Sequence, residues 1–167
     1  YLTYTNVKKA LIIGSGYIGI ETAEALISLG IETSILEREN LPMPSLEDET
    51  SYIIHEILRK KKVDFYGNVK EPKFHIHDNK IVYINIDGWR YEYDLFLITA
   101  GIEPNISLAI ASKLQLGETG AIKVDQKLRT SDPNIFAAGD CIEVINHITN
   151  KPTYLPIAVL AQQFGHI

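Results

Sequence analysis

The 167-residue sequence predicts an α/β fold: a doubly wound parallel sheet with a three-stranded antiparallel meander, followed by an incomplete second α/β unit. Three observations predict it. Apolar, β-rich runs alternate with stretches of helical periodicity as far as residue 66. The hydrophobic period then changes to two residues between residues 73 and 93, and the character of the chain shifts again after Pro104. We therefore expect one domain over residues 1–103 and a second, truncated domain over residues 104–167.

The first part of the chain has the pattern of two strand–helix pairs followed by a third strand. Gly14 stops the first apolar run, and Gly30 stands where a glycine commonly ends a helix in a left-handed conformation. The second helical stretch has acidic residues at its start and basic residues at its end, which suits the helix dipole. The expected strands cover residues 7–13, 33–36 and 63–66, and the expected helices cover residues 18–29 and 46–62.

Residues 73–93 alternate between polar and apolar side chains in three short segments, as half-buried strands do. Asp78-Asn79 and Asp87-Gly88 separate these segments and are typical of two-residue hairpin turns. The apolar run of residues 95–99 predicts a further buried strand, which ends at Ala100-Gly101. Beyond Pro104 we expect a helix over residues 109–114, short strands over residues 122–124 and 134–138, and a helix over residues 157–167.

The overall composition excludes several classes of protein. Hydrophobic residues make up 46% of the chain, enough for a buried core, whereas the net charge of −5 argues against a general nucleic-acid binder. No apolar run approaches the roughly 18 residues that span a membrane. The lone cysteine, Cys141, rules out an internal disulfide framework and favours a reducing compartment such as the cytoplasm. His75 and His77 share one face of a strand, but without further ligands they predict no metal site.

Gly14-Ser15-Gly16-Tyr17-Ile18-Gly19 forms a G-x-G-x-x-G motif between the first expected strand and the first expected helix. In a Rossmann-like fold each glycine has a separate task. Gly14 permits the tight turn, Gly16 lets the backbone approach a pyrophosphate, and Gly19 lets helix and strand pack closely. The start of the helix attracts phosphates with its free N–H groups. The motif therefore predicts a dinucleotide site, and a glycine-rich turn without a ligand is the alternative interpretation.

Glu37 follows the second expected strand, 18 residues after Gly19. A carboxylate at this position accepts hydrogen bonds from the adenosine ribose of NAD(H) and repels the 2′-phosphate of NADP(H). Arg38 lies beside it and could accommodate that phosphate, unless it is a solvated loop charge. NAD(H) is therefore the expected nucleotide, with NADP(H) as the less favoured alternative.

Three motifs, in order, resemble those of the FAD- and NAD-dependent pyridine nucleotide–disulfide oxidoreductases, in particular the coenzyme A-disulfide reductase and NADH oxidase branch. They are LIIGSGYIGIETAEAL, ITAGIEPN and RTSDPNIFAAGDC, and the resemblance covers nearly the whole chain. It implies an NAD(H)-binding domain from which the chain crosses back, near Gly101, into part of an FAD-binding domain. It also implies that Gly139 and Asp140 meet the ribityl–phosphate part of FAD, that Tyr17 is an aromatic gate over the flavin, and that Glu21 pairs with a lysine near it.

The same resemblance implies a function. In the parent protein, a homodimer, a hydride would pass from the nicotinamide to FAD, and the electrons would go on to a small-molecule acceptor, a disulfide or oxygen. The second glycine motif and the redox-active cysteine of the family are not in this sequence, so we expect a fragment of a larger flavoenzyme. Two alternatives stay open. The chain could come from a rubredoxin, ferredoxin or nitrite reductase flavoprotein, or it could act as a dinucleotide-binding module without turnover.

Overall fold

A computed structural model describes residues 6–166 of the chain. The chain divides into two compact units, Tyr1–Gly101 and Ile102–Ile167. Each unit has its own cluster of buried apolar residues, two such clusters in the first unit and one in the second. Among the described residues, no helix is long and apolar enough to cross a membrane.

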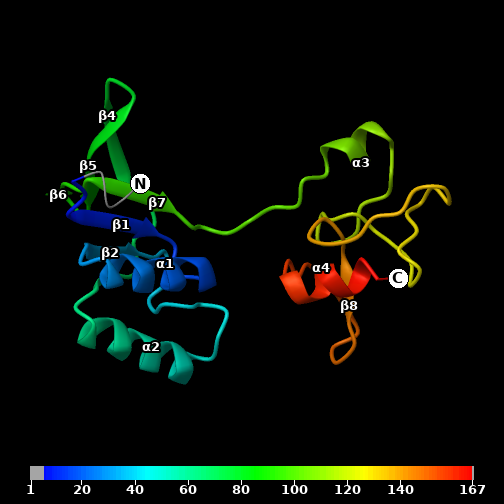
Figure 1. Ribbon diagram of the computed structural model, residues 1–167, viewed down its shortest axis with the longest axis horizontal. Helices are drawn as coiled ribbons and strands as arrows, with labels where there is room; N and C mark the ends of the chain where they lie inside the picture. The colour runs from blue at the N-terminus through cyan, green and yellow to red at the C-terminus, as the bar shows by residue number, and fades with distance from the viewer. Residues whose placement is uncertain (1–5, 167) are drawn as a thin grey trace. The chain divides into compact units, whose positions relative to one another are not determined.

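The first unit is built on a four-stranded parallel sheet with the order β3-β2-β1-β7 (Figure 1). The two central strands, β1 (Lys9–Ile13) and β2 (Glu32–Leu36), are buried along most of their length because both faces of the sheet are covered. The outer strands are β3 (Asp64–Tyr66) and β7 (Leu95–Ile98). The expected Rossmann-like parallel sheet is therefore confirmed.

Both helices of the first unit pack on the same face of this sheet (Figure 1). They are α1 (Tyr17–Ser28) and α2 (Asp48–Lys60). Ala23 and Leu26 of α1 and Leu58 of α2 lie in one core cluster with alternate residues of β1 and β2. The predicted acidic start and basic end of α2 are both present, so its charged residues complement the helix dipole.

The opposite face of the sheet is covered by the antiparallel meander, which is formed by β4 (Lys73–His77), β5 (Lys80–Ile86) and β6 (Trp89–Tyr91). Its strands pair in sequence order, as predicted. The residues of both predicted two-residue turns adopt the left-handed conformations that such tight turns need. The side chains buried between meander and sheet are those of Leu11, Leu36, Val69, Ile84 and Ile86.

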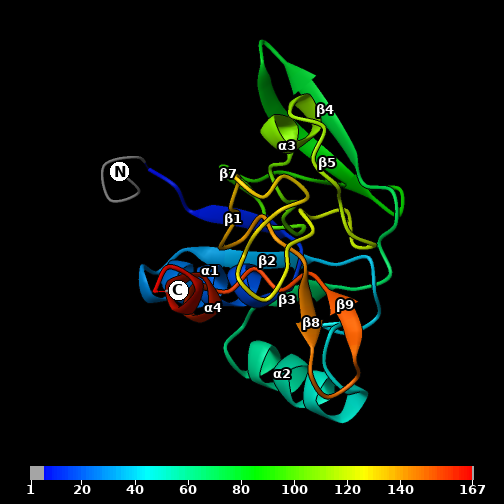
Figure 2. The ribbon, with the colours of Figure 1, turned by 90° about the vertical axis from the view of Figure 1, so that its right-hand side faces the viewer.

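The second unit contains α3 (Ser107–Ala111), β8 (Val144–Asn146), β9 (Lys151–Thr153) and α4 (Ala158–Phe164). β8 and β9 form an antiparallel hairpin that precedes α4 (Figure 2). Much of the remaining backbone is irregular and is joined by isolated bridges. The buried core cluster of this unit consists of Ala109, Ile122, Leu128 and Ile142.

Two expected strands of the second unit are wrong. In residues 122–124, Ile122 is buried but makes only isolated bridges to Leu116 and Ile142 instead of a ladder. In residues 134–138, the one bridge joins Phe136 to Arg129, and the Phe136 side chain is 63% exposed. An apolar run predicts burial, but a strand also needs a neighbour that pairs with it over several residues, and among the described residues each of these runs is bridged at a single residue.

Other boundaries in the second unit also differ from expectation. The helix expected over residues 109–114 is α3, which begins two residues earlier and ends three residues earlier. α4 is shorter than the run of residues 157–167 suggests, and residue 167 lies outside the described range. The hairpin of β8 and β9 is not predicted by the sequence pattern. Pro152 lies in β9, and proline is confined to edge positions of β-structure because it cannot donate to the ladder.

Candidate functional site

The carboxyl ends of the parallel strands meet at one edge of the first unit. β1 pairs with both β2 and β7, so Ile13 lies opposite Leu36 on one side and Ile98 on the other. The turns that follow these three residues therefore start side by side. The G-x-G-x-x-G motif lies in the first turn, Glu37 in the second and Thr99 in the third. In open parallel sheets this edge is where ligands bind.

Two of the three motif glycines are required by the fold itself. Gly14 has φ +105°, and a Cβ there would lie 2.6 Å from the backbone oxygen of Thr99. A Cβ on Gly19 would overlap the carbonyl oxygen of Gly14. The Thr99 hydroxyl fastens the same turn, because it donates to the carbonyl oxygens of Ile13 and Gly14 at 3.1 and 2.8 Å. These two glycines let β1, α1 and β7 approach one another closely.

Gly16 is different, because the packing of the protein does not explain it. Its φ of −68° and ψ of −172° are open to any residue. No atom outside its immediate chain neighbours lies within 4 Å of the Cβ that another residue would carry there. Gly16 is the N-cap of α1, and the first N–H groups of a helix have no partner within that helix. The space in front of Gly16 is therefore open to a group from outside the protein.

The Glu37 carboxylate is half-buried and accepts hydrogen bonds from four donors. Ser15 donates to Oε2 from its backbone N and from its Oγ, at 2.9 and 2.6 Å. The backbone N–H groups of Arg38 and Glu39 donate to Oε1 at 2.7 and 3.2 Å. Burial raises the pKa of Glu37, but the hydrogen bonds, those from Ser15 foremost, outweigh burial and lower the pKa below its ordinary value. A carboxylate anion therefore lies beside the glycine motif at neutral pH.

Arg38 is exposed, and its Nε donates to Oε1 of Glu39 at 3.2 Å. Exposed ion pairs of this kind contribute little to stability, so the guanidinium is not firmly held. A cavity of about 480 Å³ opens next to these residues, between the segment that follows Glu37 and the start of α2. It is lined by residues 38–41 together with Pro44, Asp48 and Ser51.

The remaining predicted residues of this edge lie at the start of α1. Tyr17 and Ile18 are 65% and 53% exposed, although both have large apolar parts. Glu21 lies one turn further along the helix and is also exposed. The structure thus brings the glycine motif, Glu37 and Arg38 together at one sheet edge, with Glu21 on the adjoining helix.

The other predicted residues lie at the end of the first unit or in the second. Gly101 ends the first unit with φ +108°. Gly139 has φ +82°, and a Cβ there would lie 3.7 Å from the Cβ of Ala161 in α4. Asp140 follows directly and is exposed. The roles of these residues toward a flavin stay predictions.

The segment after β2 is fastened to the glycine motif by contacts that the sequence pattern does not reveal. The backbone N–H of Met43 donates to the carbonyl oxygen of Ser15 at 3.1 Å. The hydroxyl of Ser51 donates in turn to the carbonyl oxygen of Met43, also at 3.1 Å. Pro42 and Pro44 mark a loop in the sequence but not the point at which it is anchored. Met43 therefore joins Thr99 among the site residues that sequence reasoning missed.

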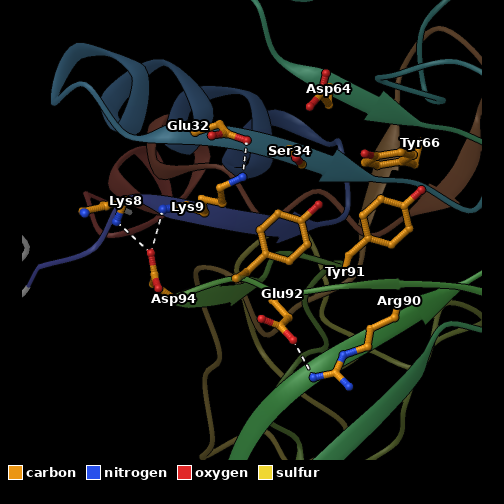
Figure 3. Close-up of a pocket in the computed structure, with 11 residues that line it drawn as sticks. Lys8, Lys9, Glu32, Ser34, Asp64, Tyr66, Arg90, Tyr91, Glu92 and Asp94 are labelled. Carbon is orange, nitrogen blue, oxygen red and sulfur yellow. Dashed lines mark hydrogen bonds and ion pairs between the residues drawn. The ribbon is translucent and has the colours of Figure 1, made fainter.

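A larger cavity, of about 750 Å³, lies at the opposite edge of the sheet, where β1, β2 and β3 begin (Figure 3). Most of its charged groups are already paired within the protein. Lys9 pairs with Glu32 and Arg90 with Glu92, while Asp94 accepts hydrogen bonds from two backbone N–H groups. No group of three or more side chains able to hold a metal ion occurs in the described part of the chain. The carboxyl edge is therefore the stronger candidate for a nucleotide.

Comparison with known proteins decides the family. The sequence model of the pyridine nucleotide-disulphide oxidoreductases matches residues 2–159. The chain belongs to this family. Among pyridine nucleotide-disulphide oxidoreductases, an NAD(P)H sulfur oxidoreductase (CoA-dependent) of Pyrococcus furiosus is 32% identical over 176 residues, which cover all of this chain and 38% of the relative. An NADH oxidase of Methanocaldococcus jannaschii is 31% identical over all of this chain and 37% of its own length. This family member thus spans somewhat more than a third of the curated relatives that it matches.

Solved structures of the family share the fold. A NAD-dependent persulfide reductase from A. fulgidus superposes with a TM-score of 0.90 at 37% identity, over 96% of this chain and 30% of that chain. A water-forming NADH oxidase from Lactobacillus brevis, bound to NADH, gives a TM-score of 0.86 at 30% identity, over 96% of this chain and 35% of that chain. Both the predicted fold class and the resemblance to pyridine nucleotide-disulphide oxidoreductases are confirmed.

Proposed function

We propose that this chain supplies the NAD(H)-binding unit, and part of the FAD-binding unit, of a flavin-dependent NAD(P)H oxidoreductase. The observation that carries the proposal is Gly16, which faces open space at the start of α1 although neither its conformation nor its packing requires a glycine. A dinucleotide pyrophosphate would occupy the space that a side chain would block. The names of the relatives, an NADH oxidase and an NAD(P)H sulfur oxidoreductase, support the same proposal.

The residues of the carboxyl edge fit NAD(H). The free N–H groups and the positive end of the dipole of α1 would hold the pyrophosphate in front of Gly16. Glu37 would accept hydrogen bonds from the adenosine ribose, and the cavity next to Arg38 and Glu39 would take the adenine. When bound, the nicotinamide and the flavin supply the hydride transfer of such an oxidoreductase.

The charge of Glu37 supports NAD(H) over NADP(H). The hydrogen bonds that lower its pKa keep the carboxylate ionised, and an anion at this position would repel a 2′-phosphate. Arg38 is the residue that would favour NADP(H), but it is exposed, whereas the Glu37 carboxylate is fixed beside the glycine motif. NADP(H) is therefore the less favoured nucleotide.

We assign part of the flavin site to the second unit. Asp140 follows the left-handed Gly139 and is exposed, as a carboxylate must be to accept hydrogen bonds from the ribityl–phosphate part of FAD. Tyr17 and Glu21, exposed on α1, would lie where the nicotinamide meets the flavin, Tyr17 as a gate and Glu21 as the partner of a lysine. Gly101 would mark the passage from one unit to the other.

The electron acceptor of the whole protein would be a small molecule, a disulfide or oxygen, and the protein would be a cytoplasmic homodimer. The lone cysteine supports the reducing compartment. A second candidate function is a dinucleotide-binding module that catalyses nothing on its own. The single glycine motif and the share of the relatives' length that the chain spans favour this second candidate for the 167 residues taken alone.

The test of NAD(H) binding is Gly16→Ala in the 167-residue chain. We expect calorimetry to show NADH binding in the wild type and a loss of at least about tenfold in the variant, because the added methyl group lies where the pyrophosphate would approach. The free energy of unfolding should change by less than about 1 kcal/mol, since the added Cβ has no atom of another segment within 4 Å.

The matched control is Gly30→Ala at the other end of α1, where φ is +76°. Alanine there is strained, so we expect a loss of about 1 kcal/mol of stability with unchanged NADH affinity. A wild-type chain that does not bind NADH, or a Gly16→Ala variant that binds it equally well, would contradict the proposal.

A further inference from the structure

We propose that Ser15 is a positioning residue for nucleotide choice: its hydroxyl fixes the Glu37 carboxylate so that the chain separates NADH from NADPH. The inference rests on the proposed function, because it concerns the same site. It goes beyond that function by assigning the discrimination to a residue that need not touch the nucleotide. Two separate observations carry it, the burial of Ser15 and the way in which its polar atoms are used.

Ser15 is fully buried, with 0% of its surface exposed. A side chain without access to solvent interacts with other groups of the protein, and here the hydroxyl donates to an ionised carboxylate. The Oγ donates to Oε2 of Glu37 at 2.6 Å, the shortest of the four hydrogen bonds to this carboxylate. Hydrogen bonds to a charged acceptor are stronger than those between neutral groups. Ser15 is therefore the residue that donates to the Glu37 carboxylate from both its hydroxyl and its backbone N–H.

The backbone of Ser15 makes this hold rigid. Its N–H donates to the same Oε2, and its carbonyl oxygen accepts the N–H of Met43. The other carboxylate oxygen is fixed by the backbone of Arg38 and Glu39. A carboxylate bound on both oxygens cannot rotate without breaking several of these bonds. The negative charge of Glu37 thus stays at one place beside the glycine motif.

A fixed charge discriminates better than a mobile one. The Glu37 carboxylate would be a preformed hydrogen-bond acceptor for the ribose of NADH. The 2′-phosphate of NADPH would lie beside an anion whose position is fixed. In Ser15→Ala the three backbone N–H donors remain, but the hydroxyl donor is lost. The Glu37 carboxylate is then fixed by three donors instead of four, and its greater freedom weakens NADH binding and eases the repulsion of NADPH.

The experiment measures the dissociation constants of NADH and NADPH by calorimetry for the wild-type chain, Ser15→Ala, Glu37→Ala and the double variant. We expect Ser15→Ala to reduce the preference for NADH over NADPH by about tenfold. In the Glu37→Ala background the same substitution should leave the ratio unchanged, because Ser15 acts through Glu37. Ser34→Ala, a buried serine in the middle of β2 that lines the cavity at the opposite edge of the sheet, is the matched control and should keep the wild-type ratio.

A second readout is the pH dependence of NADH binding. Protonation of Glu37 removes the anion, so binding weakens as the pH falls through its pKa, which Ser15 helps to lower. In Ser15→Ala the acid midpoint should move to higher pH. A residue that serves only to fill space would not move it. Should Ser15→Ala not fold, Ser15→Cys has a similar size and a weak donor, and the same lower ratio and higher midpoint are expected.

The results separate the two proposals. A wild-type chain that binds neither nucleotide contradicts the proposed function. A wild-type chain that prefers NADH, together with a Ser15→Ala or Ser15→Cys variant of unchanged preference and midpoint, overturns the inference about Ser15 alone. An equal change of the ratio in the presence and absence of Glu37 overturns it as well.

Discussion

Single carboxylates fasten both ends of β1 to its neighbours. At the start, Asp94 stands one residue before β7, and its Oδ2 accepts the backbone N–H groups of Lys8 and Lys9 at 2.8 and 2.9 Å (Figure 3). These backbone hydrogen bonds, from Lys8 and then Lys9, lower the pKa of Asp94 below its ordinary value. At the other end, Glu37 holds the turn that leaves β1 through Ser15. The first unit therefore depends on two ionised groups for the position of this central strand.

We expect Asp94→Ala to destabilise the chain at neutral pH and to make it less sensitive to acid. The pKa of Asp94 in the folded chain lies below the ordinary 3.8. The carboxylate therefore stabilises the fold above that pH, and this contribution is lost as the pH falls through the folded pKa. Urea unfolding of the wild type and the variant over a series of pH values measures the effect. Glu71→Ala, at an exposed loop position, is the control, and an unchanged acid response in Asp94→Ala would refute the fastening role.

At the residue scale, sequence reasoning finds the groups with special chemistry but not their partners. The place of Glu37 after β2 predicts a ribose acceptor, since that position is defined along the chain. Its bonds to Ser15 depend on the parallel register that sets Ile13 opposite Leu36, and no local pattern contains that register. The roles of Thr99 and Met43 could not be predicted for the same reason. Each is hydrogen-bonded to the glycine turn from a segment that is distant in the sequence.

At the scale of elements, the contact of α1 with β1 is as close as backbone allows. A Cβ on Gly19 would overlap the carbonyl oxygen of Gly14, and the Thr99 hydroxyl lies 3.0 Å from the same position. Neither a backbone oxygen nor a hydroxyl that is hydrogen-bonded to the glycine turn can move aside cheaply. The helix would have to shift away from the strand to accept even one methyl group.

Gly19→Ala should therefore cost about 2 kcal/mol or more of the free energy of unfolding. Alanine has a higher helix propensity than glycine, so propensity alone would make the variant more stable. The expected loss of stability therefore comes from the steric overlap. Denaturant unfolding measures it, with Glu24→Ala at an exposed position of the same helix as the control. If Gly19→Ala were as stable as the wild type, the close contact would not limit the packing of α1.

The elements of the first unit could be predicted to within about two residues, because their signals are local. The helix expected over residues 18–29 is α1, that over residues 46–62 is α2, and all three strands of the meander are present. In the second unit the apolar runs of residues 122–124 and 134–138 have a composition typical of strands. Among the described residues they make only isolated bridges and no ladder. Composition predicts burial more securely than it predicts pairing.

At the scale of the whole molecule, the chain combines one glycine motif with only part of its relatives' length. In the family that the sequence resembles, FAD binding uses a second glycine motif, and the 167 residues contain one such motif, at Gly14–Gly19. The curated relatives are more than twice as long as the part that this chain matches.

We expect the purified 167-residue chain to bind NADH but to hold no stoichiometric FAD and to reduce no disulfide. An absorbance spectrum of the purified chain, before and after added FAD, measures the flavin content. Gly16→Ala serves as the control for any NADH-dependent signal. A yellow chain whose flavin is bleached by NADH would instead show that the 167 residues already act as a flavin reductase.

The Asp78-Asn79 turn of the meander is a position at which a second protein could be inserted into the chain. Both residues have positive φ, +49° and +57°, and they join β4 to β5, which within residues 6–166 pair with each other and, for β5, with β6. The meander covers the sheet face opposite α1, so the turn does not contact the glycine motif (Figure 1). A fluorescent protein inserted between β4 and β5 would leave the hydrogen bonds of Glu37 and Ser15 intact. The turn is therefore the position at which we expect the first unit to accept a large insertion without disturbing the proposed nucleotide site.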